Sequence, residues 1–224
     1  MTEIYPSSQE GLILSNKILH SHPYNFCGAL VTGKRGAGKS CYGLIVSHEI
    51  FVSLGFEPKF EAWNMALDHC LFSIEDIIEV LEKASTTENK ERVVLWDDLG
   101  VYASAGTWFT NMKMAVRLKG VMDMVRECTC GLIMTTPTQS NILGFLRSYD
   151  DFIIQISYDM RGSFYRNAKI YRKYTLPSGK KLVFHQGTDH YFSYLPTWVF
   201  KKYSEKRRAC WVKLVGELKE TVKE

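Results

Sequence analysis

The sequence predicts an α/β protein, a three-layer sandwich with a mostly parallel central sheet. Short apolar runs alternate with helical patterns as far as residue 158, which is typical of parallel strands covered by helices on both faces. A glycine-rich run at 33–40 stands between the first apolar run and the first helical pattern. After residue 160 the pattern changes and predicts a C-terminal β-hairpin followed by one long helix.

Length and composition fit one domain with additions at its ends. The chain has 224 residues, 46% hydrophobic and 23% charged, so it can bury the core of an ordinary globular protein. We divide it into a lead-in at 1–25, a core at 26–160 and a basic appendage at 161–224. The N-terminus lacks the pattern of a signal peptide, and no apolar run approaches the ~18 residues of a membrane span, so we expect a cytoplasmic protein.

Apolar runs and helical spacing place the core elements. The predicted strands are 26–32, 92–96, 130–136 and 151–158, with a shorter one near Cys70–Phe72. The predicted helices are 41–54, 74–84, 111–127 and 140–146. Ser73 and Asp76 form the N-cap pattern at the start of the second of these helices.

The appendage has two parts. Residues 163–186 alternate between apolar and polar side chains on either side of Pro177-Ser178-Gly179, which predicts two strands joined by a turn. Pro196 then opens a helical stretch that continues to the end of the sequence.

The glycine-rich run has the residue types that hold a polyphosphate. Small residues let backbone N–H groups turn inward around phosphate oxygens, and the following helix adds the partial positive charge of its N-terminus. Lys39 is expected to reach the β and γ phosphates, and the Ser40 hydroxyl to bind Mg²⁺. The predicted class is therefore a P-loop NTPase with ATP and Mg²⁺ as cofactors. The candidate phosphate-binding residues are Gly33, Lys34, Arg35, Gly36, Ala37, Gly38, Lys39, Ser40 and Cys41.

Two acidic residues follow the apolar run at 92–96. Asp97, at the end of a buried strand, is expected to hold Mg²⁺ through its water shell. Asp98 is placed to polarise an attacking water as a general base. Aspartate is shorter than glutamate, so this base requires tight geometry.

Thr135 and Thr136 end the next apolar strand, which we expect between the strands carrying the other two motifs. One hydroxyl, with Thr135 preferred, would sense the γ phosphate or position the water; alternatively, both residues simply favour a strand that enters a turn. Arg147 closes the helix at 140–146 and is the candidate arginine that completes a neighbouring subunit's site in a homo-oligomer. Arg126 is the second choice, and a plain surface arginine is the alternative.

Charge is divided unevenly along the chain. Residues 1–159 hold 13 Lys and Arg against 19 Asp and Glu, a net of −6, whereas residues 160–224 hold 15 against 5, a net of +10. This predicts an acidic partner, most simply DNA, contacted through residues 161–208; the alternative is a solvated basic surface. The basic candidates are Arg161, Arg166, Lys169, Arg172, Lys173, Lys180 and Lys181 near the hairpin, and Lys201, Lys202, Lys206, Arg207 and Arg208 on the last helix.

Cysteine and histidine give no metal-site pattern. None of the six cysteines forms a CxxC pair, and His20 and His22 are isolated from other ligand types. We expect reduced and mostly buried thiols, with Cys128 and Cys130 on the same face of a strand.

The stretch from Gly28 to Trp198 resembles the DnaA-like ATPases encoded by archaeal fuselloviruses and related plasmids, a branch of the AAA+ class. The segments that carry the resemblance are GKRGAGKS at 33–40, WNMALD at 63–68, the Walker B segment WDDLGV at 96–101, TTP at 135–137 and LPTWVF at 195–200. It implies an ATPase of a mobile element that acts on DNA in replication initiation, helicase loading or a related step. This sequence departs from the AAA+ pattern because a hairpin and one long helix stand in place of a full helical lid, and the helix-turn-helix domain of DnaA is lacking.

Two other functions fit the same motifs. One is a genome-packaging or virion-assembly ATPase, so the partner protein would belong either to replication or to packaging. The other is a nucleotide-dependent scaffold with little turnover, which Asp98 in place of the more usual glutamate keeps open. The NKxD pattern that reads guanine is absent from the sequence, which favours ATP over GTP.

Overall fold

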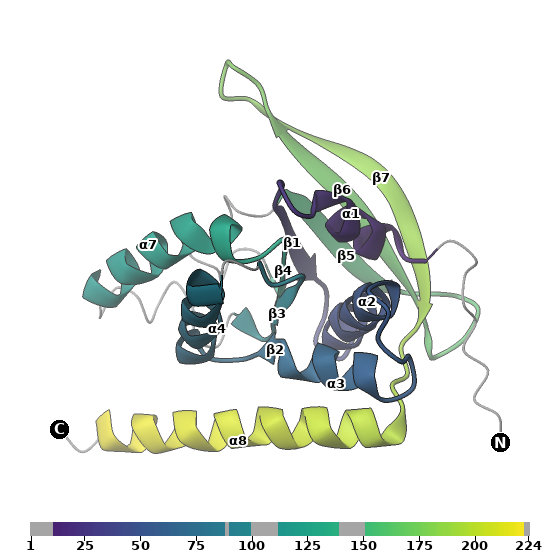
Figure 1. Ribbon diagram of the computed structural model, residues 1–224. Coiled ribbons are helices and arrows are strands. Elements are labelled where there is room, and N and C mark those ends of the chain that lie inside the picture. Colours follow the sequence, from purple (N-terminus) through teal and green to yellow (C-terminus); the bar gives the residue numbers. More distant parts are fainter. Residues whose placement is uncertain (1–10, 88–89, 100–111, 139–150, 222–224) are drawn as a thin grey trace.

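The computed structural model describes residues 11–87, 90–99, 112–138 and 151–221 (Figure 1). The helices in these ranges are α1 (Ile13–Ser21), α2 (Lys39–Ser53), α3 (Glu61–Asp68), α4 (Ile74–Thr87), α7 (Met112–Cys128) and α8 (Thr197–Thr221). The strands are β1 (Cys27–Thr32), β2 (Cys70–Leu71), β3 (Val94–Trp96), β4 (Gly131–Thr136), β5 (Phe152–Tyr158), β6 (Tyr165–Thr175) and β7 (Lys181–Phe192).

The strands of the described ranges form one seven-stranded sheet in the order β2-β3-β4-β1-β5-β6-β7. The strands from β2 to β5 in this order pair in parallel, whereas β6 and β7 pair antiparallel. This confirms the predicted mostly parallel sheet and the place of β4 between β1 and β3. Because the carboxyl ends of parallel strands share one edge, the segments after β1, β3 and β4 meet there.

Helices cover both faces of the sheet. On one face, α1, α2 and α3 pack with a cluster that includes Val31, Leu95 and Ile133 (Figure 1). On the other, α4 and α7 pack with Leu30 and Trp96. All six residues of β1 and of β4 are buried, which explains why these strands are almost continuously apolar in sequence.

The predicted N-cap of α4 is confirmed. The backbone N–H of Asp76 donates to Ser73 Oγ at 3.1 Å, and the N–H of Ser73 donates to Asp76 Oδ2 at 3.2 Å. This reciprocal pair supplies acceptors for backbone donors that the first helical turn leaves without partners.

The predicted shared strand face of Cys128 and Cys130 is wrong. Cys128 is the last residue of α7 and Cys130 precedes β4, because the helix continues one residue farther and the strand begins one residue later than the apolar run indicates. Both side chains are buried, and all six cysteines are free, which agrees with the expected reduced thiols.

Residues 161–224 are built onto the same sheet. β6 pairs with β5 from Tyr158 to Phe152, and β7 pairs with β6 across the predicted turn. The expected boundary at residue 160 therefore falls between two paired strands. After β7, α8 crosses the molecule beside α3 (Figure 1). Neither α8 nor any other helix in the described ranges combines the length and the hydropathy of a bilayer-spanning segment.

Candidate nucleotide site

The loop at 33–38 joins β1 to α2 and has the backbone shape that phosphate binding requires. Gly36 and Gly38 have φ angles of 75° and 96°, which residues with a Cβ rarely adopt. Gly38 is the N-cap of α2, so the positive end of that helix lies at the loop. A Cβ on Gly33 would lie 2.9 Å from the carbonyl oxygen of Ile156, so β5 also requires glycine at the start of the loop.

Side chains of the hairpin strands β6 and β7 donate hydrogen bonds to the backbone of this loop. Arg166 of β6 donates from Nε to the Ala37 carbonyl at 3.1 Å, and the Tyr191 hydroxyl of β7 donates to the Gly38 carbonyl at 3.0 Å. Arg166 is only 6% exposed. From sequence, Arg166 is grouped with the candidate DNA contacts. In the structure its guanidinium is instead buried and bonded to the protein backbone. The shape of the phosphate loop therefore depends on β6 and β7.

Lys39 is the first residue of α2. Its ammonium group donates to the carbonyl oxygens of Gly33 and Lys34, both at 3.0 Å. Burial lowers the pKa of Lys39, while the charges of Asp98 and Asp97 act in the opposite direction. A phosphate group would give this ammonium a stronger partner than two neutral carbonyls, because charge-assisted hydrogen bonds are stronger.

Asp97 follows β3, and its carboxyl group accepts three hydroxyl hydrogen bonds. Ser40 Oγ and Thr135 Oγ1 donate to Oδ1 at 2.8 and 2.5 Å, and the Tyr203 hydroxyl donates to Oδ2 at 2.6 Å. Asp97 is 0% exposed. Burial and the neighbouring charge of Asp98 raise its pKa, and the three hydroxyl groups oppose that rise. The phosphate-loop helix, β4 and α8 thus meet at one carboxyl group.

Asp98 is held on both its backbone and its side chain. Its φ angle of 52° is unusual for a residue with a Cβ, and its N–H donates to Thr135 Oγ1 at 3.0 Å. The Thr135 hydroxyl therefore bonds to both acidic residues. The Asp98 carboxylate accepts a hydrogen bond from the guanidinium of Arg207, which forms an ion pair with it. A strained residue fixed by such contacts is typical of functional sites.

Tyr203 and Arg207 are the site residues that sequence reasoning missed. From sequence alone, Arg207 belongs to the basic tail and Tyr203 has no mark of function. The available signal is their spacing, since residues four apart lie on the same side of a helix. That signal becomes informative only when α8 is known to lie against the end of β3.

Other basic residues fix α8 in this position. Lys206 Nζ donates to the Leu67 carbonyl of α3 at 2.8 Å, and Lys202 Nζ donates to Asn64 Oδ1 at 3.0 Å. With Arg207, these residues make three members of the basic tail that contact the protein itself. The positive charge of α8 therefore serves at least partly to dock the helix.

The remaining loop and strand candidates lie close by. Lys34, Arg35 and Gly36 are exposed on the loop. Thr136 is buried, and its hydroxyl donates to the Thr138 carbonyl at 3.1 Å, whereas Thr135 contacts the acidic residues. Cys41 lies in the first turn of α2, and burial raises the pKa of its thiol to about 12.

Of the two candidate arginines, Arg126 lies away from this site within one chain. Arg126 forms an exposed ion pair with Glu127 at 3.2 Å near the end of α7, which leads into the opposite edge of the sheet. Arg147 and the predicted helix at 140–146 lie outside the described residues.

The arrangement fits a nucleotide with Mg²⁺. The Ser40 hydroxyl and the Asp97 carboxyl group are the oxygen ligands that Mg²⁺ prefers, and they are in direct contact. Lys39 and the N-terminus of α2 bring positive charge to the same place. Asp98, the next residue in the chain, adds a second carboxylate, which is paired with Arg207.

Several solved structures are similar to this chain at low sequence identity. A solved ATPase domain aligns with a TM-score of 0.42 and 11% identity over 71% of this chain and 80% of that domain. The flagellar accessory protein FlaH from Methanocaldococcus jannaschii aligns with a TM-score of 0.39 and 12% identity over 79% of this chain and 92% of that one. The N-terminal domain of zonular occludens toxin from Neisseria meningitidis has a TM-score of 0.36 and 11% identity over 73% and 95% of the two chains.

Two viral proteins are similar in sequence, while no model of a protein family matches the chain. The uncharacterized protein ORF286 of Acidianus two-tailed virus is 26% identical over 160 residues, which are 69% of this chain and 51% of that protein. This chain thus spans about half the length of ORF286. The uncharacterized protein B-251 of Sulfolobus spindle-shape virus 1 is 31% identical over 223 residues, covering 96% of this chain and 87% of B-251. With its P-loop NTPase fold, the chain belongs to the family of the Sulfolobus spindle-shape virus 1 protein B-251.

Proposed function

We propose that this protein is a Mg²⁺-dependent ATPase of a viral or plasmid mobile element. The observation that carries the proposal is the convergence of hydroxyl groups on Asp97. Ser40 from the phosphate-loop helix and Thr135 from β4 both donate to Oδ1 of Asp97. One network therefore joins the phosphate loop, a metal-binding carboxylate and a hydroxyl placed to sense the γ phosphate.

Each residue has a defined part in the proposed reaction. Lys39 and the loop N–H groups bind the phosphates, and Ser40 and Asp97 hold Mg²⁺, which when bound neutralises phosphate charge. Asp98 orients the attacking water and accepts its proton as general base. Thr135, bonded to the backbone of Asp98 and to Asp97, fixes the direction of both acidic residues.

We also propose that hydrolysis is coupled to a DNA transaction, such as replication initiation or helicase loading, in the host cytoplasm. The net charge of +10 over residues 160–224 supports an acidic partner, and the motifs resemble those of DnaA-like AAA+ ATPases. In a homo-oligomer, Arg147 or Arg126 of one copy would complete the site of the next. A packaging ATPase would use the same site and differ in its partner protein.

ATP turnover with and without DNA tests this proposal, together with the mass of the protein with and without ATP. We expect Mg²⁺-dependent hydrolysis by the wild type and loss of ATP binding in Lys39→Ala. Asp98→Asn is expected to bind ATP but to hydrolyse it at least about 100-fold more slowly. DNA-stimulated turnover and a larger mass with ATP would support the coupling and the oligomer; ATP binding without any Mg²⁺-dependent turnover would contradict the enzyme.

A nucleotide-dependent scaffold is a second candidate, and the contact between Arg207 and Asp98 favours it. The guanidinium occupies the carboxylate that general-base catalysis needs. A scaffold of this kind would show equal and negligible turnover in the wild type and in Asp98→Asn, with ATP-dependent assembly kept in both.

A further inference from the structure

The distal part of the β6–β7 hairpin extends beyond the core. The last fully buried residue of β6 is Ile170, which lies at a register shift next to Tyr171. Of the described side chains between 171 and 186, none is buried. Figure 1 shows this end of the hairpin projecting past the helices. Its side chains are therefore available to a partner.

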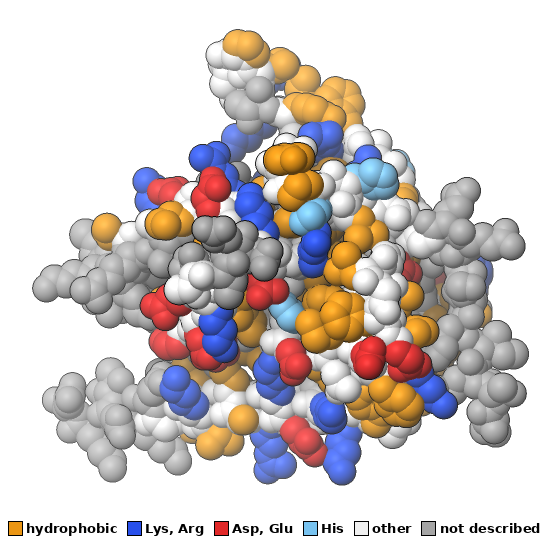
Figure 2. Space-filling model, in the orientation of Figure 1, with side chains coloured by type: hydrophobic (Ala, Val, Ile, Leu, Met, Phe, Trp, Pro, Cys, Tyr) orange, Lys and Arg blue, Asp and Glu red, His pale blue; other side chains and the backbone are white. Residues whose placement is uncertain are grey.

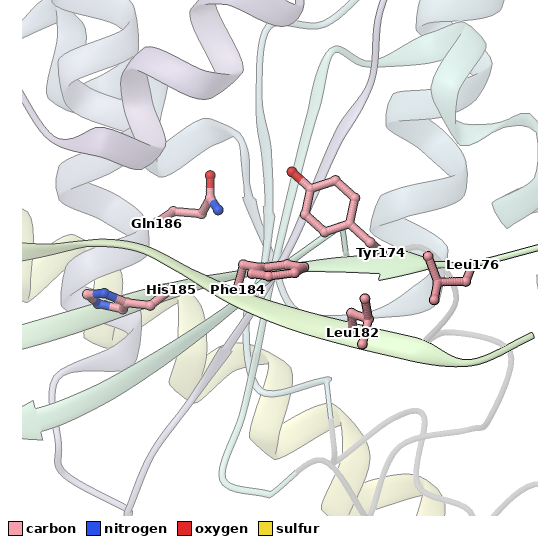
Figure 3. Close-up of a pocket in the computed structure, with 6 residues that line it drawn as sticks. All are labelled: Tyr174, Leu176, Leu182, Phe184, His185 and Gln186. Atoms are coloured by element: carbon pink, nitrogen blue, oxygen red, sulfur yellow. The ribbon is translucent and has the colours of Figure 1, made fainter.

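Apolar and aromatic side chains gather on this projection. Tyr174 is 40% exposed, and Val183 and Phe184 are 53% and 51% exposed. The Tyr174 and Phe184 rings lie 5.5 Å apart at 75°, and an open hollow of about 560 Å³ lies beside them. Figure 3 shows the residues that line this hollow: Tyr174, Leu176, Leu182, Phe184, His185 and Gln186. Aromatic faces at a projecting edge are typical of binding surfaces.

The charge around these rings has one sign. Residues 160–188 contain no Asp or Glu, and their seven basic residues are Arg161, Arg166, Lys169, Arg172, Lys173, Lys180 and Lys181. The Arg172 guanidinium lies 5.1 Å from the centre of the Tyr174 ring, and Lys180 and Lys181 are exposed beside the turn. In Figure 2, Lys and Arg side chains accompany the hydrophobic atoms of this region. The surface therefore attracts an anion that also offers flat apolar groups.

The turn itself is ordered by hydrogen bonds. The N–H of Leu176 donates to the Lys180 carbonyl at 2.9 Å, and the N–H of Gly179 donates to the Leu176 carbonyl at 2.8 Å. Gly179 has a φ angle of 78°, which suits glycine. The backbone that carries the rings and the lysines is thus ordered before any partner binds, which lowers the entropic cost of binding.

We propose that the distal hairpin binds single-stranded nucleic acid, with bases stacked on Tyr174 and Phe184 and phosphates near Lys180 and Lys181. A single strand offers both unstacked bases and backbone charge, whereas a duplex keeps its bases stacked inside and offers mainly charge. This inference deepens the proposed coupling to DNA, on which it rests. It assigns the contact to the hairpin and leaves Arg166, Lys206 and Arg207, whose side chains donate hydrogen bonds within the protein, to the protein's own structure.

Binding of a fluorescent oligothymidine by the full chain, followed by anisotropy in about 50 mM and about 200 mM salt, tests the inference. We expect Tyr174→Leu with Phe184→Leu to weaken binding at least about tenfold without changing the salt dependence, because leucine keeps apolar bulk but removes the stacking face. Lys180→Gln with Lys181→Gln should lower the salt slope by about 1.4, since each single-strand phosphate contact contributes about 0.7.

The matched control variant changes two residues of α8. Trp211 is a 64% exposed aromatic residue and Lys201 is an exposed lysine, so Trp211→Ala with Lys201→Gln removes the same residue types from another surface. This control should bind oligothymidine like the wild type. Thermal melting of every variant separates a lost contact from a lost fold, and single replacements at Tyr174 and Phe184 repeat the test if the double variant unfolds.

Three results would overturn the inference. The first is wild-type affinity in the folded leucine variants, as expected if the surface docks an apolar protein or a second copy instead. The second is equal affinity for duplex and single strand, and the third is no binding by the wild type in about 50 mM salt. ATP turnover without DNA, measured in parallel, keeps the two proposals apart: turnover without strand binding rejects only the hairpin, and strand binding without turnover rejects only the ATPase.

Discussion

The hydroxyl of Tyr203 on α8 donates a 2.6 Å hydrogen bond to Oδ2 of Asp97, the buried carboxyl group at the end of β3. Tyr203 is 6% exposed, and burial raises its pKa well above the usual range, so the hydroxyl keeps its proton and acts as a donor. α8 therefore contacts the proposed metal-binding residue directly. If ligand binding moves the Asp97 carboxyl group, the hydrogen bond to Tyr203 passes that movement directly to α8.

Tyr203→Phe should destabilise the nucleotide-free protein more than the protein with Mg²⁺ and ATP. Without the hydroxyl, Oδ2 of Asp97 is buried and lacks this donor, at a cost of about 1–3 kcal/mol. A cation beside Ser40 and Asp97 would compensate that oxygen, so ATP with Mg²⁺ should raise the Tm of the variant more than that of the wild type. Thermal melting with and without Mg²⁺ and ATP measures both quantities.

Tyr194→Phe is the control for this prediction, because Tyr194 is 47% exposed and lies after β7. It should melt like the wild type in both conditions. If ATP with Mg²⁺ raises the Tm of the wild type and of Tyr203→Phe equally, the Tyr203 hydroxyl is not coupled to ligand binding at Asp97.

Arg207→Ala should lower ATP turnover at least about tenfold, since one positioned charge at a phosphoryl-transfer site often contributes more than this. The guanidinium pairs with Asp98, and its charge adds to the effect of burial in lowering the pKa of Lys39. Steady-state hydrolysis compares this variant with Arg208→Ala, which removes the neighbouring exposed arginine and should stay within about twofold of wild type. Faster hydrolysis in Arg207→Ala would instead mean that the ion pair restrains the base.

The phosphate loop and Asp97 could be predicted because their signals are local. Left-handed backbone at Gly36 and Gly38 requires glycine, and an aspartate directly after a buried strand lies at the carboxyl edge of the sheet. The position of β4 between β1 and β3 could also be predicted, because P-loop sheets share a strand order. These features need only the neighbouring residues and the general topology.

Other features depend on tertiary contacts that no local pattern records. Arg166 has the sequence signature of a surface cation, yet its guanidinium is buried against the Ala37 carbonyl. Tyr203 and Arg207 join the site only because α8 docks beside α3. α3 itself is eight residues long and follows Pro58, so its apolar spacing was too short to identify it.

Arg166→Lys should weaken ATP binding about three- to tenfold while the protein stays folded. Lysine cannot reproduce the separate donations from Nε to Ala37 and from Nη1 to the Ser163 carbonyl, so the loop loses part of its support. Titration with a fluorescent ATP analogue measures the affinity. Arg161→Lys changes the exposed ion pair with Asp159 and should leave the affinity unchanged, and equal affinities in both variants would contradict a role of β6 in shaping the loop.

The pair of His69 and Glu91 should make stability depend on pH. Burial lowers the pKa of His69, but its bonds to Glu91 and to the Met65 carbonyl outweigh burial and leave it above the usual 6.5. The bond to His69 lowers the pKa of Glu91 below its usual 4.5, against the effect of burial. The pair's contribution is therefore complete between these two ordinary values, is lost as pH rises through the raised value of His69, and is lost in acid as Glu91 takes up its proton.

Thermal melting of wild type and Glu91→Gln from about pH 5.5 to about pH 8.5 tests this dependence, because the range spans the titration of histidine. The wild type should exceed the variant in Tm most clearly at the acid end, and the difference should shrink toward pH 8.5 as His69 loses its charge. Glu79→Gln breaks an exposed ion pair with Lys83 and should give a small difference that does not change over this range. A gap between wild type and Glu91→Gln that stays constant with pH would mean that His69 is neutral throughout, and that its hydrogen bonds alone join the start of β2 to the segment before β3.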